Sequence, residues 1–239
     1  MASQIIAMGG GGFSMEPANL ALDRYVVQQA ATRNGRPKVC FLPTASGDAE
    51  LYILHFYEAF TSLDCIPSSL SLFRLPTGDL DDYILEKDVL YVGGGNTRSL
   101  LALWCEWGLD RLLLRACEQG TLLAGISAGA NCWFTQCSTD SLPGKLTVLD
   151  CLGYLPGSFC PHYDGEVERR PSFQRMVGGG EILPGWACDD GAALHFVDGQ
   201  LVRAVRSRPH AQAFWLEPDG AGGAVEQLLE MLDVFQVKT

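Results

Sequence analysis

Short, uninterrupted apolar segments alternate with stretches of helical spacing over the first 130 residues, and no other feature constrains the fold as strongly. The segments are rich in β-branched residues, which is typical of strands buried on both faces of a parallel sheet. We expect strands in SQIIAMG (3–9), KVCFLPT (38–44), SLSLFRL (69–75), DVLYVGG (88–94) and TLLAGIS (121–127), and helices over residues 19–32, 50–62, 98–107 and 109–118. The sequence therefore predicts an α/β fold with a doubly wound, mostly parallel sheet.

The pattern weakens after residue 127. Prolines are spread through residues 128–184, and we expect loops there that cover the sheet. Two strands then join at Asp198-Gly199, a strong hairpin signal, and residues 211–220 predict a further strand. Residues 224–236 have the spacing of a closing helix. Because no repeat or linker interrupts the chain, we expect one domain over residues 1–239.

Composition limits the classes of function. The 239 residues are 47% hydrophobic, enough for a large core, and carry a formal net charge of −11. This acidity argues against binding to nucleic acids or anionic membranes. The nine cysteines include no C-x-x-C pair, so we expect buried thiols in a reducing compartment and neither a metal nor an organic cofactor. No signal peptide or membrane span is recognised, which predicts a cytoplasmic protein, as a monomer or homodimer.

Two glycine clusters follow predicted strands. Gly9 to Gly12 do not match the dinucleotide fingerprint, because the sixth position is Ser14 or Met15, and the lysine of a P-loop is missing. This favours a flexible turn over a phosphate site. In YVGGGNTRSLL the backbone N–H groups could meet a ligand oxygen, as in an oxyanion hole. The alternative is a tight turn in which Asn96 or Thr97 caps the following helix.

One serine lies at the end of an apolar segment in the pattern Gly125-Ile126-Ser127-Ala128-Gly129. This G-x-S-x-G pattern is typical of a nucleophile elbow, where a strand turns sharply into a helix and lifts the hydroxyl into a cleft. Bulky residues at 125 and 129 would obstruct such a turn. The sequence predicts Ser127 as a nucleophile, and the alternative is a small residue in a tight corner.

A serine nucleophile needs a histidine that accepts its proton and an acid that orients the histidine. His162 lies in GSFCPHYDGEVERRPSF, a loop dense with polar groups, and we expect it to be the base. His195, within a predicted strand, is expected to be structural. For the acid, Asp140 is the first candidate, Glu166 the second and Asp164 the third.

Four motifs in order, YVGGGNTRSLLALW, GISAGANCWF, STDSLPG and CPHYDGE, resemble the peptidase E (aspartyl dipeptidase) and cyanophycinase family of serine peptidases. The resemblance extends from residue 38 to residue 196. It implies a fold akin to class I glutamine amidotransferases, with Ser127 as nucleophile and His162 as base. Gly94, Gly95 and the N–H of Ala128 would form the oxyanion hole. Ser141 occupies the place of the family's acid, one residue after Asp140, and some relatives use a glutamate instead.

The resemblance also implies a substrate. Peptidase E releases an N-terminal aspartate from short peptides, and an arginine downstream of the histidine binds the aspartate side chain. Arg169 and Arg170 lie in the matching region, and Asn96 is a further candidate for substrate binding. We therefore expect a serine exopeptidase that cleaves small peptides after an N-terminal aspartate. The alternatives are cyanophycinase-like hydrolysis of β-aspartyl-arginine peptides and a non-catalytic ligand-binding relative.

Overall fold

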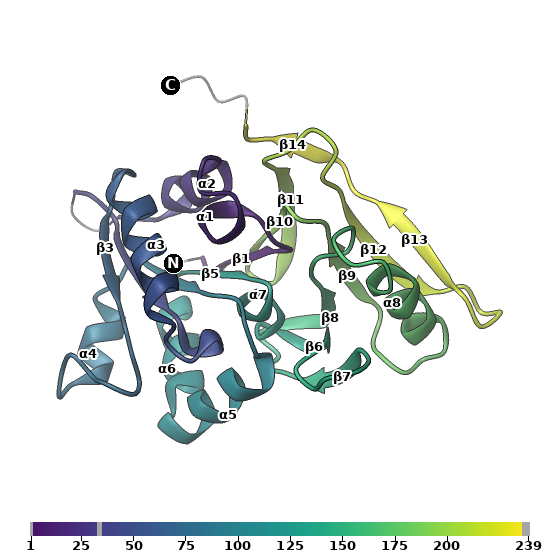
Figure 1. Cartoon of the computed structure of the whole chain (residues 1–239), viewed down its shortest axis with the longest axis horizontal. Helices are drawn as coiled ribbons and strands as arrows, with labels where there is room; N and C mark the ends of the chain where they lie inside the picture. The colour runs from purple at the N-terminus through teal and green to yellow at the C-terminus, as the bar shows by residue number, and fades with distance from the viewer. Residues whose placement is uncertain (1, 33–34, 236–239) are drawn as a thin grey trace.

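The computed structural model describes residues 2–32 and 35–235, which form two sheets that lie side by side (Figure 1). The larger sheet contains β1 (Gln4–Met8), β2 (Lys38–Leu42), β3 (Ile66–Ser69), β4 (Val89–Val92), β5 (Leu122–Ile126), β10 (Ala192–Val197), β11 (Gln200–Arg206) and β14 (Met231–Asp233). The smaller sheet contains β6 (Phe134–Thr139), β7 (Thr147–Asp150), β8 (Leu155–Cys160), β9 (Gly185–Cys188), β12 (Ala213–Pro218) and β13 (Ala224–Leu228). The helices are α1 (Gly12–Met15), α2 (Ala21–Gln29), α3 (Glu50–Thr61), α4 (Leu80–Leu85), α5 (Thr97–Trp107), α6 (Leu109–Glu118), α7 (Ala128–Asn131) and α8 (Arg169–Gly178), with a 3-10 turn at Thr44–Ser46.

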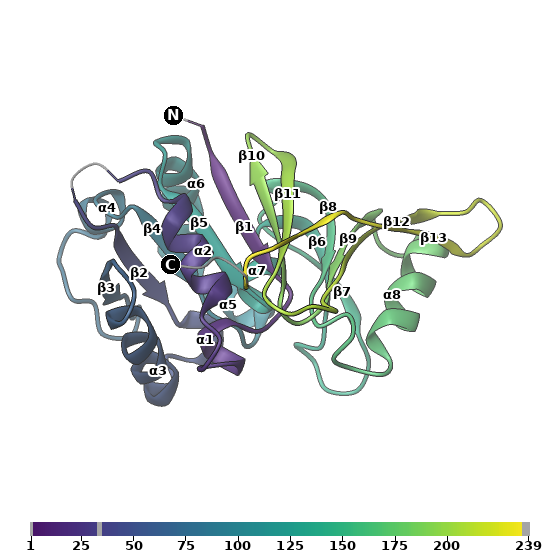
Figure 2. The ribbon, with the colours of Figure 1, turned by 90° about the horizontal axis from the view of Figure 1, so that it is seen from above.

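The larger sheet has the strand order β14-β11-β10-β1-β5-β4-β2-β3, and the five strands from β1 to β3 in this order pair in parallel. Successive side chains of a strand point to opposite faces. Ile6 and Met8 accordingly pack in one core with α1, α2 and α3, whereas Ile5 and Ala7 pack in another with α5 and α6. Figure 2 shows helices on both sides of these strands. The predicted doubly wound, mostly parallel α/β sheet is therefore confirmed.

The smaller sheet was not predicted, although its strand β12 confirms the strand expected over residues 211–220. Its order is β13-β12-β9-β8-β6-β7, with α8 packed against β12 and β13. Much of it lies in the proline-rich region that was expected to be loops. Its strands are short, and three of them, β8, β9 and β12, include or adjoin prolines, which weakens the strand pattern in the sequence. Within the described residues no helix is long and apolar enough to cross a membrane.

The predicted closing helix over residues 224–236 is wrong. The structure has two strands there, and β13 pairs antiparallel with β12, with Leu228 opposite Phe214. Pairing with a neighbouring strand thus overrides a helical pattern in the sequence. Residue 236 lies outside the described residues. The strand predicted over residues 69–75 is also displaced, because β3 ends at Ser69.

The other local predictions are confirmed. The four predicted helices correspond to α2, α3, α5 and α6, with ends that differ by at most a few residues. The hairpin at residues 198–199 joins β10 to β11, and both turn residues have positive φ, 48° at Asp198 and 76° at Gly199. This geometry is typical of a two-residue hairpin turn.

His195 is a buried, hydrogen-bonded residue of β10, as predicted. Its Nδ1 lies 2.9 Å from the Tyr25 hydroxyl and its Nε2 lies 3.0 Å from the Gln4 Oε1. Burial, aided by the positive charge of Arg203, lowers the pKa of His195 to about 4. The folded protein therefore stays unprotonated at this site at pH values where the unfolded chain binds a proton.

This shift predicts a pH-dependent stability. Because the unfolded histidine titrates near its usual pKa and the folded one near 4, the stability that His195 contributes falls as the pH drops from about 6.5 towards 4. The loss is on the order of 3 kcal/mol. Urea unfolding of the wild type and of His195→Gln at pH 7 and at pH 4.5 measures this loss. Between pH 7 and pH 4.5 the free energy of unfolding of the wild type should fall by about this amount more than that of the variant. A difference that is independent of pH would contradict the prediction.

Candidate active site

Ser127 lies at the apex of the turn between β5 and α7. Its backbone has φ 57° and ψ −117°, a conformation that non-glycine residues rarely adopt and that is concentrated at functional sites. Positions 125 and 129 have to be glycine, because a side chain at either position would collide with the backbone. A Cβ on Gly125 would lie 2.0 Å from the carbonyl oxygen of Gly129, and a Cβ on Gly129 would lie 2.3 Å from that of Val92. The G-x-S-x-G pattern thus forms the sharp elbow expected from the sequence.

His162 joins this serine to a carboxylate. The Nε2 of His162 lies 2.8 Å from the Ser127 Oγ, and its Nδ1 lies 2.6 Å from the Oδ1 of Asp190. All three side chains are therefore connected in one line of hydrogen bonds. His162 also has a positive φ, of 53°. Ser127 and His162, whose side chains share a hydrogen bond, therefore both have strained backbones.

Two neighbouring parallel strands bring His162 and Asp190 together. His162 follows the end of β8 by two residues, Asp190 follows the end of β9 by two residues, and Cys160 pairs with Ala187. The backbone N–H of Asp190 donates to the Oδ1 of Asp164 at 2.8 Å. Asp164, the third candidate for the acid, therefore holds the backbone of Asp190 rather than the imidazole.

The electrostatics favour a charged Asp190. Burial opposes the charged form, but the hydrogen bond and the positive charge of His162, aided by Arg208 and Arg169, outweigh it and hold the pKa of Asp190 below its usual value. A carboxylate at this position fixes the Nδ1–H tautomer of His162 and leaves Nε2 free to accept a proton from the serine.

The first two sequence candidates for the acid, Asp140 and Glu166, lie elsewhere. Both face the buried guanidinium of Arg169, with its Nη2 at 2.8 Å from the Glu166 Oε1 and at 3.5 Å from the Asp140 Oδ2. The prediction that Asp140 orients His162 is therefore wrong in this structure. The reason is that Asp140 follows β6, whereas the carboxylate that reaches the imidazole follows β9.

The two arginines expected to bind a substrate carboxylate already have acidic partners. Arg169 is paired with Glu166, and its side chain is only 3% exposed. Arg170 is paired with Glu226 of β13, and its guanidinium lies over the rings of Tyr163 and Phe214.

Asn96 caps α5. Its Oδ1 accepts from the N–H of Ser99 at 2.9 Å, and its Nδ2 donates to the carbonyl oxygen of Ser141 at 2.9 Å. This geometry agrees with the helix-cap alternative. The same turn brings Gly94 beside the serine, because a Cβ on Gly94 would lie 3.3 Å from the Cβ of Ser127. The N–H of Gly94 donates to the Tyr52 hydroxyl at 3.1 Å.

Gly95 and Ala128 complete the set of residues expected at the oxyanion hole. Gly95 has a φ of 138°, and a Cβ there would lie 2.2 Å from the carbonyl oxygen of Ala45. Ala128 is the first residue of α7, so its N–H is among those that have no acceptor within the helix.

Gly10 packs directly against the acid and the base. A Cβ on Gly10 would lie 1.9 Å from the Oδ1 of Asp190 and 2.8 Å from the Nδ1 of His162. The glycines after β1 therefore make room for these side chains. The prediction of a turn at the active edge of the sheet, in place of a phosphate loop, agrees with this position.

The Gly10→Ala variant should consequently lose activity through displacement of Asp190. We expect kcat to fall by about 100-fold or more, since a shift of about 1 Å in a catalytic group has an effect of this size. Steady-state kinetics measure the loss. Gly78→Ala is the matched control, because a Cβ at Gly78 meets no atom within 4 Å. Equal activities of the two variants would show that Asp190 and His162 tolerate the displacement.

No group of three or more His, Cys, Asp or Glu residues in the described part of the chain is arranged to hold a metal ion.

A doubly wound α/β fold with a serine elbow, a histidine and an aspartate in one line of hydrogen bonds defines a hydrolase of the serine type. Comparison with known proteins gives the family. The model of Peptidase family S51 matches residues 5–204, and the chain belongs to this family of serine-type peptidases. The resemblance to peptidase E predicted from the motifs is thereby confirmed.

Several relatives are similar over much of their length. A Bacillus subtilis protein named uncharacterized peptidase YgaJ is 57% identical over 211 residues, which are 88% of this chain and 90% of the relative. A Citrobacter koseri protein named peptidase E is 30% identical over 62% of this chain and 64% of its own length. The solved structure of a peptidase from an acI-B1 actinobacterium superposes with a TM-score of 0.67, at 17% identity, over 97% of this chain and 95% of its own. This last likeness concerns the fold.

Proposed function

We propose that the chain is a serine exopeptidase that cleaves short peptides through an acyl-enzyme, with Ser127 as nucleophile, His162 as general base and acid, and Asp190 as the orienting acid. The observation that carries this proposal is the line of hydrogen bonds through His162, 2.8 Å to the serine and 2.6 Å to the aspartate. Both distances are within the range needed for proton transfer. The restriction to chain ends is what the resemblance of the motifs to peptidase E implies.

The mechanism follows from these positions. His162 Nε2 takes the proton of Ser127 as the Oγ attacks the carbonyl carbon of the scissile bond, and Asp190 stabilises the imidazolium that forms. The negative oxygen of the tetrahedral intermediate would be met by the N–H groups of Gly95 and Ala128. The C–N bond then breaks, and His162 returns the proton to the leaving amine. Water attacks the acyl-enzyme by the same route and releases the acid.

The N–H of Gly94 can join the oxyanion hole only after a change. In the structure its hydrogen bond is made to Tyr52, so it would have to turn from that hydroxyl or share its hydrogen with the substrate oxygen. Gly95 and Ala128 therefore form the first pair of donors in this proposal.

An N-terminal aspartate as substrate is the finer hypothesis, and the peptidase E names of relatives support it. It requires Arg169 or Arg170 to leave a carboxylate partner for the substrate. Hydrolysis of β-aspartyl-arginine peptides is the alternative within the same chemistry. The third alternative, a non-catalytic ligand-binding relative, is less favoured because the nucleophile, base and acid are all in contact.

The test is hydrolysis of a set of dipeptides and tripeptides, each with a free amine and with an acetylated amine. We expect release of the N-terminal residue from the free peptides alone, and covalent labelling of Ser127 by a fluorophosphonate, located by peptide mass spectrometry. Folded protein that neither cleaves any peptide nor reacts at Ser127 would exclude the proposal.

A further inference from the structure

A cavity of about 440 Å³ opens beside the hydroxyl of Ser127. It is lined by Ser127 and His162, by Gly94, and by residues of α1 and of the α3 region, among them Met15, Leu51 and Tyr52. The volume is within the range of sites for small ligands. Because the cavity adjoins both the nucleophile and the base, a peptide placed for attack would extend a side chain into it.

Most of the wall surface is apolar, and Met15, Leu51 and Ile126 contribute aliphatic or thioether surface. Its polar side chains carry hydroxyl and imidazole groups, among them those of Tyr52 and His55, and none of the described residues that line the cavity is a lysine, an arginine, an aspartate or a glutamate. A carboxylate placed there would lose water without meeting a lysine or an arginine, whereas the burial of an apolar side chain is favourable.

The arginines do not supply the missing charge. Arg169 lies in a separate cavity, lined also by Asp140, Glu166 and Lys145, which does not include Ser127. Arg170 is held against Glu226 and two aromatic rings. The acid-binding groups that the family resemblance predicted are therefore absent from the cavity next to the nucleophile.

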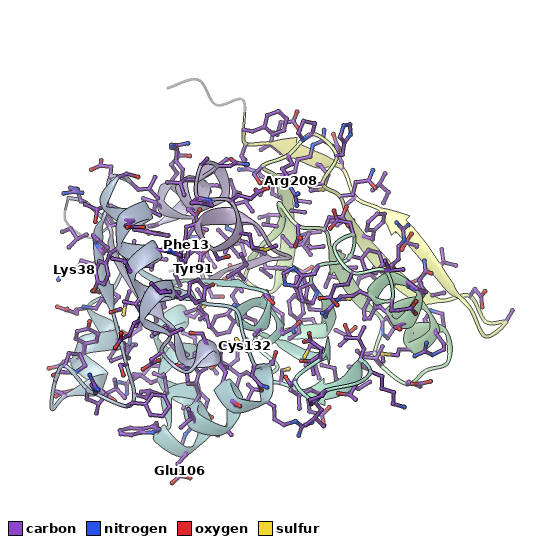
Figure 3. The ribbon with its side chains drawn as sticks, in the orientation of Figure 1. Phe13, Lys38, Tyr91, Glu106, Cys132 and Arg208 are labelled. Carbon is purple, nitrogen blue, oxygen red and sulfur yellow. The ribbon has the colours of Figure 1, made fainter. Side chains whose placement is uncertain are left out.

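The helix that carries Met15 is anchored in the core through Phe13. Phe13, two residues earlier, lies beside Tyr91 (Figure 3) and packs edge-to-face on its ring, with centroids 5.6 Å apart. The N–H of Phe13 donates to the buried carboxylate of Asp23 at 2.8 Å. Phe13 also contacts Phe41, Phe56 and Phe60. These contacts anchor α1, the short helix that ends at Met15, against the core.

Two of the wall residues expose apolar surface at the cavity. Met15 is 50% exposed and Leu51 is 70% exposed. Exposed apolar side chains that adjoin a reactive group are typical of a binding site whose ligand covers them. Here the covering ligand would be the substrate.

We propose that this cavity binds the side chain of a substrate residue next to the scissile bond and selects an apolar residue, such as leucine or methionine, over aspartate. The inference rests on the proposed function, since it assigns the substrate class of the same site. In this proposal the substrate side chain is a hydrocarbon buried against Met15, Leu51 and Ile126. It differs from the hypothesis of an N-terminal aspartate, whose carboxylate an arginine would bind.

Two dipeptide series test the preference, X-Ala and Ala-X, with X as Leu, Met, Asp or Lys and release of free alanine or X as the readout. We expect kcat/KM for Leu to exceed that for Asp by at least about 10-fold in one series, since discrimination of this size is usual for apolar pockets. The series that responds identifies whether the cavity holds the residue before or after the scissile bond.

A charge placed in the cavity gives the decisive comparison. Leu51→Arg should lower kcat/KM for the leucine peptide of the responding series by about 10-fold and raise it for the aspartate peptide. Leu54→Arg is the matched control, because Leu54 lies on the same helix, is 50% exposed and does not line the cavity. The control should retain the wild-type preference.

The outcomes separate the two proposals. Equal or better cleavage of the aspartate peptides in both series, or the same preference in Leu51→Arg and Leu54→Arg, would overturn the apolar cavity while hydrolysis through Ser127 stands. Folded protein that cleaves no peptide of either series and is not labelled at Ser127 would overturn both.

Discussion

Alanine in place of Ser127 is expected to lower kcat by about 10⁵-fold or more, because the acyl-enzyme cannot form without the hydroxyl. The remaining turnover would come from groups that still bind the peptide and stabilise the tetrahedral oxygen. Alanine retains the Cβ and leaves the contacts of Gly125 and Gly129 unchanged, so the elbow should keep its shape. Initial rates on the best peptide substrate, with the enzyme in large excess for the variant, measure the loss.

The appropriate control removes a hydroxyl away from the site. Ser71 accepts hydrogen bonds from two backbone N–H groups of its own loop, and Ser71→Ala should stay within a few-fold of the wild type. Both variants should show the far-UV circular dichroism of the wild type. Substantial turnover by Ser127→Ala, free of contaminating peptidase, would mean that another group performs the attack.

Asparagine in place of Asp190 is expected to lower kcat by about 10⁴-fold. The amide has nearly the shape of the carboxylate, but it no longer neutralises the imidazolium, and it can hold His162 in the tautomer that donates to Ser127 rather than accepts from it. Binding of the peptide should change little, so the loss should appear in kcat more than in KM. Steady-state kinetics with a range of substrate concentrations measure both constants.

Asp140→Asn is the informative comparison, since Asp140 was the acid predicted from the sequence. Its carboxylate is largely exposed and faces Arg169 at 3.5 Å, so its replacement should change kcat by no more than a few-fold. If Asp140→Asn were the damaging change and Asp190→Asn the mild one, the acid would have to be reassigned, which would require a rearrangement of the β6–β7 loop towards His162.

The elbow could be predicted from the sequence because it is a local structure. The apolar run that forms β5, the two glycines and the serine lie within eight residues, and the steric demand for small residues acts between neighbours in the chain. The same holds for the hairpin at residues 198–199, whose turn residues determine its geometry. Such features need no knowledge of the rest of the fold.

Asp190 could not be found in this way. It is 28 residues from His162, and the two meet only because β8 and β9 are adjacent parallel strands that end at the same edge. β9 is only four residues long, GWAC, and does not stand out as a strand in the sequence. Had it been recognised, the aspartates that follow it would have been strong candidates, since polar residues after parallel strands gather at one edge of a sheet.

The wrong prediction of a helix over residues 224–236 also affects what the sequence predicts for the site. A helix over residues 224–236 would not place Glu226 beside Arg170, whereas β13 does so by pairing with β12. Whether Arg170 is free to bind a substrate therefore depends on the pairing of β13 with β12, which places Glu226 beside it. The sequence resemblance names the arginines as candidates for substrate binding, but it does not predict that Glu226 pairs with Arg170.

The two sheets divide the catalytic residues between them. Ser127 comes from the end of β5 in the larger sheet, whereas His162 and Asp190 follow β8 and β9 in the smaller one. A nascent chain that has left the ribosome only as far as residue 180 contains the nucleophile and the base but neither the acid nor β9. In the proposed mechanism such a chain lacks the orienting acid, so we expect peptide-bond cleavage only after the segment that contains β9 and Asp190 has been synthesised.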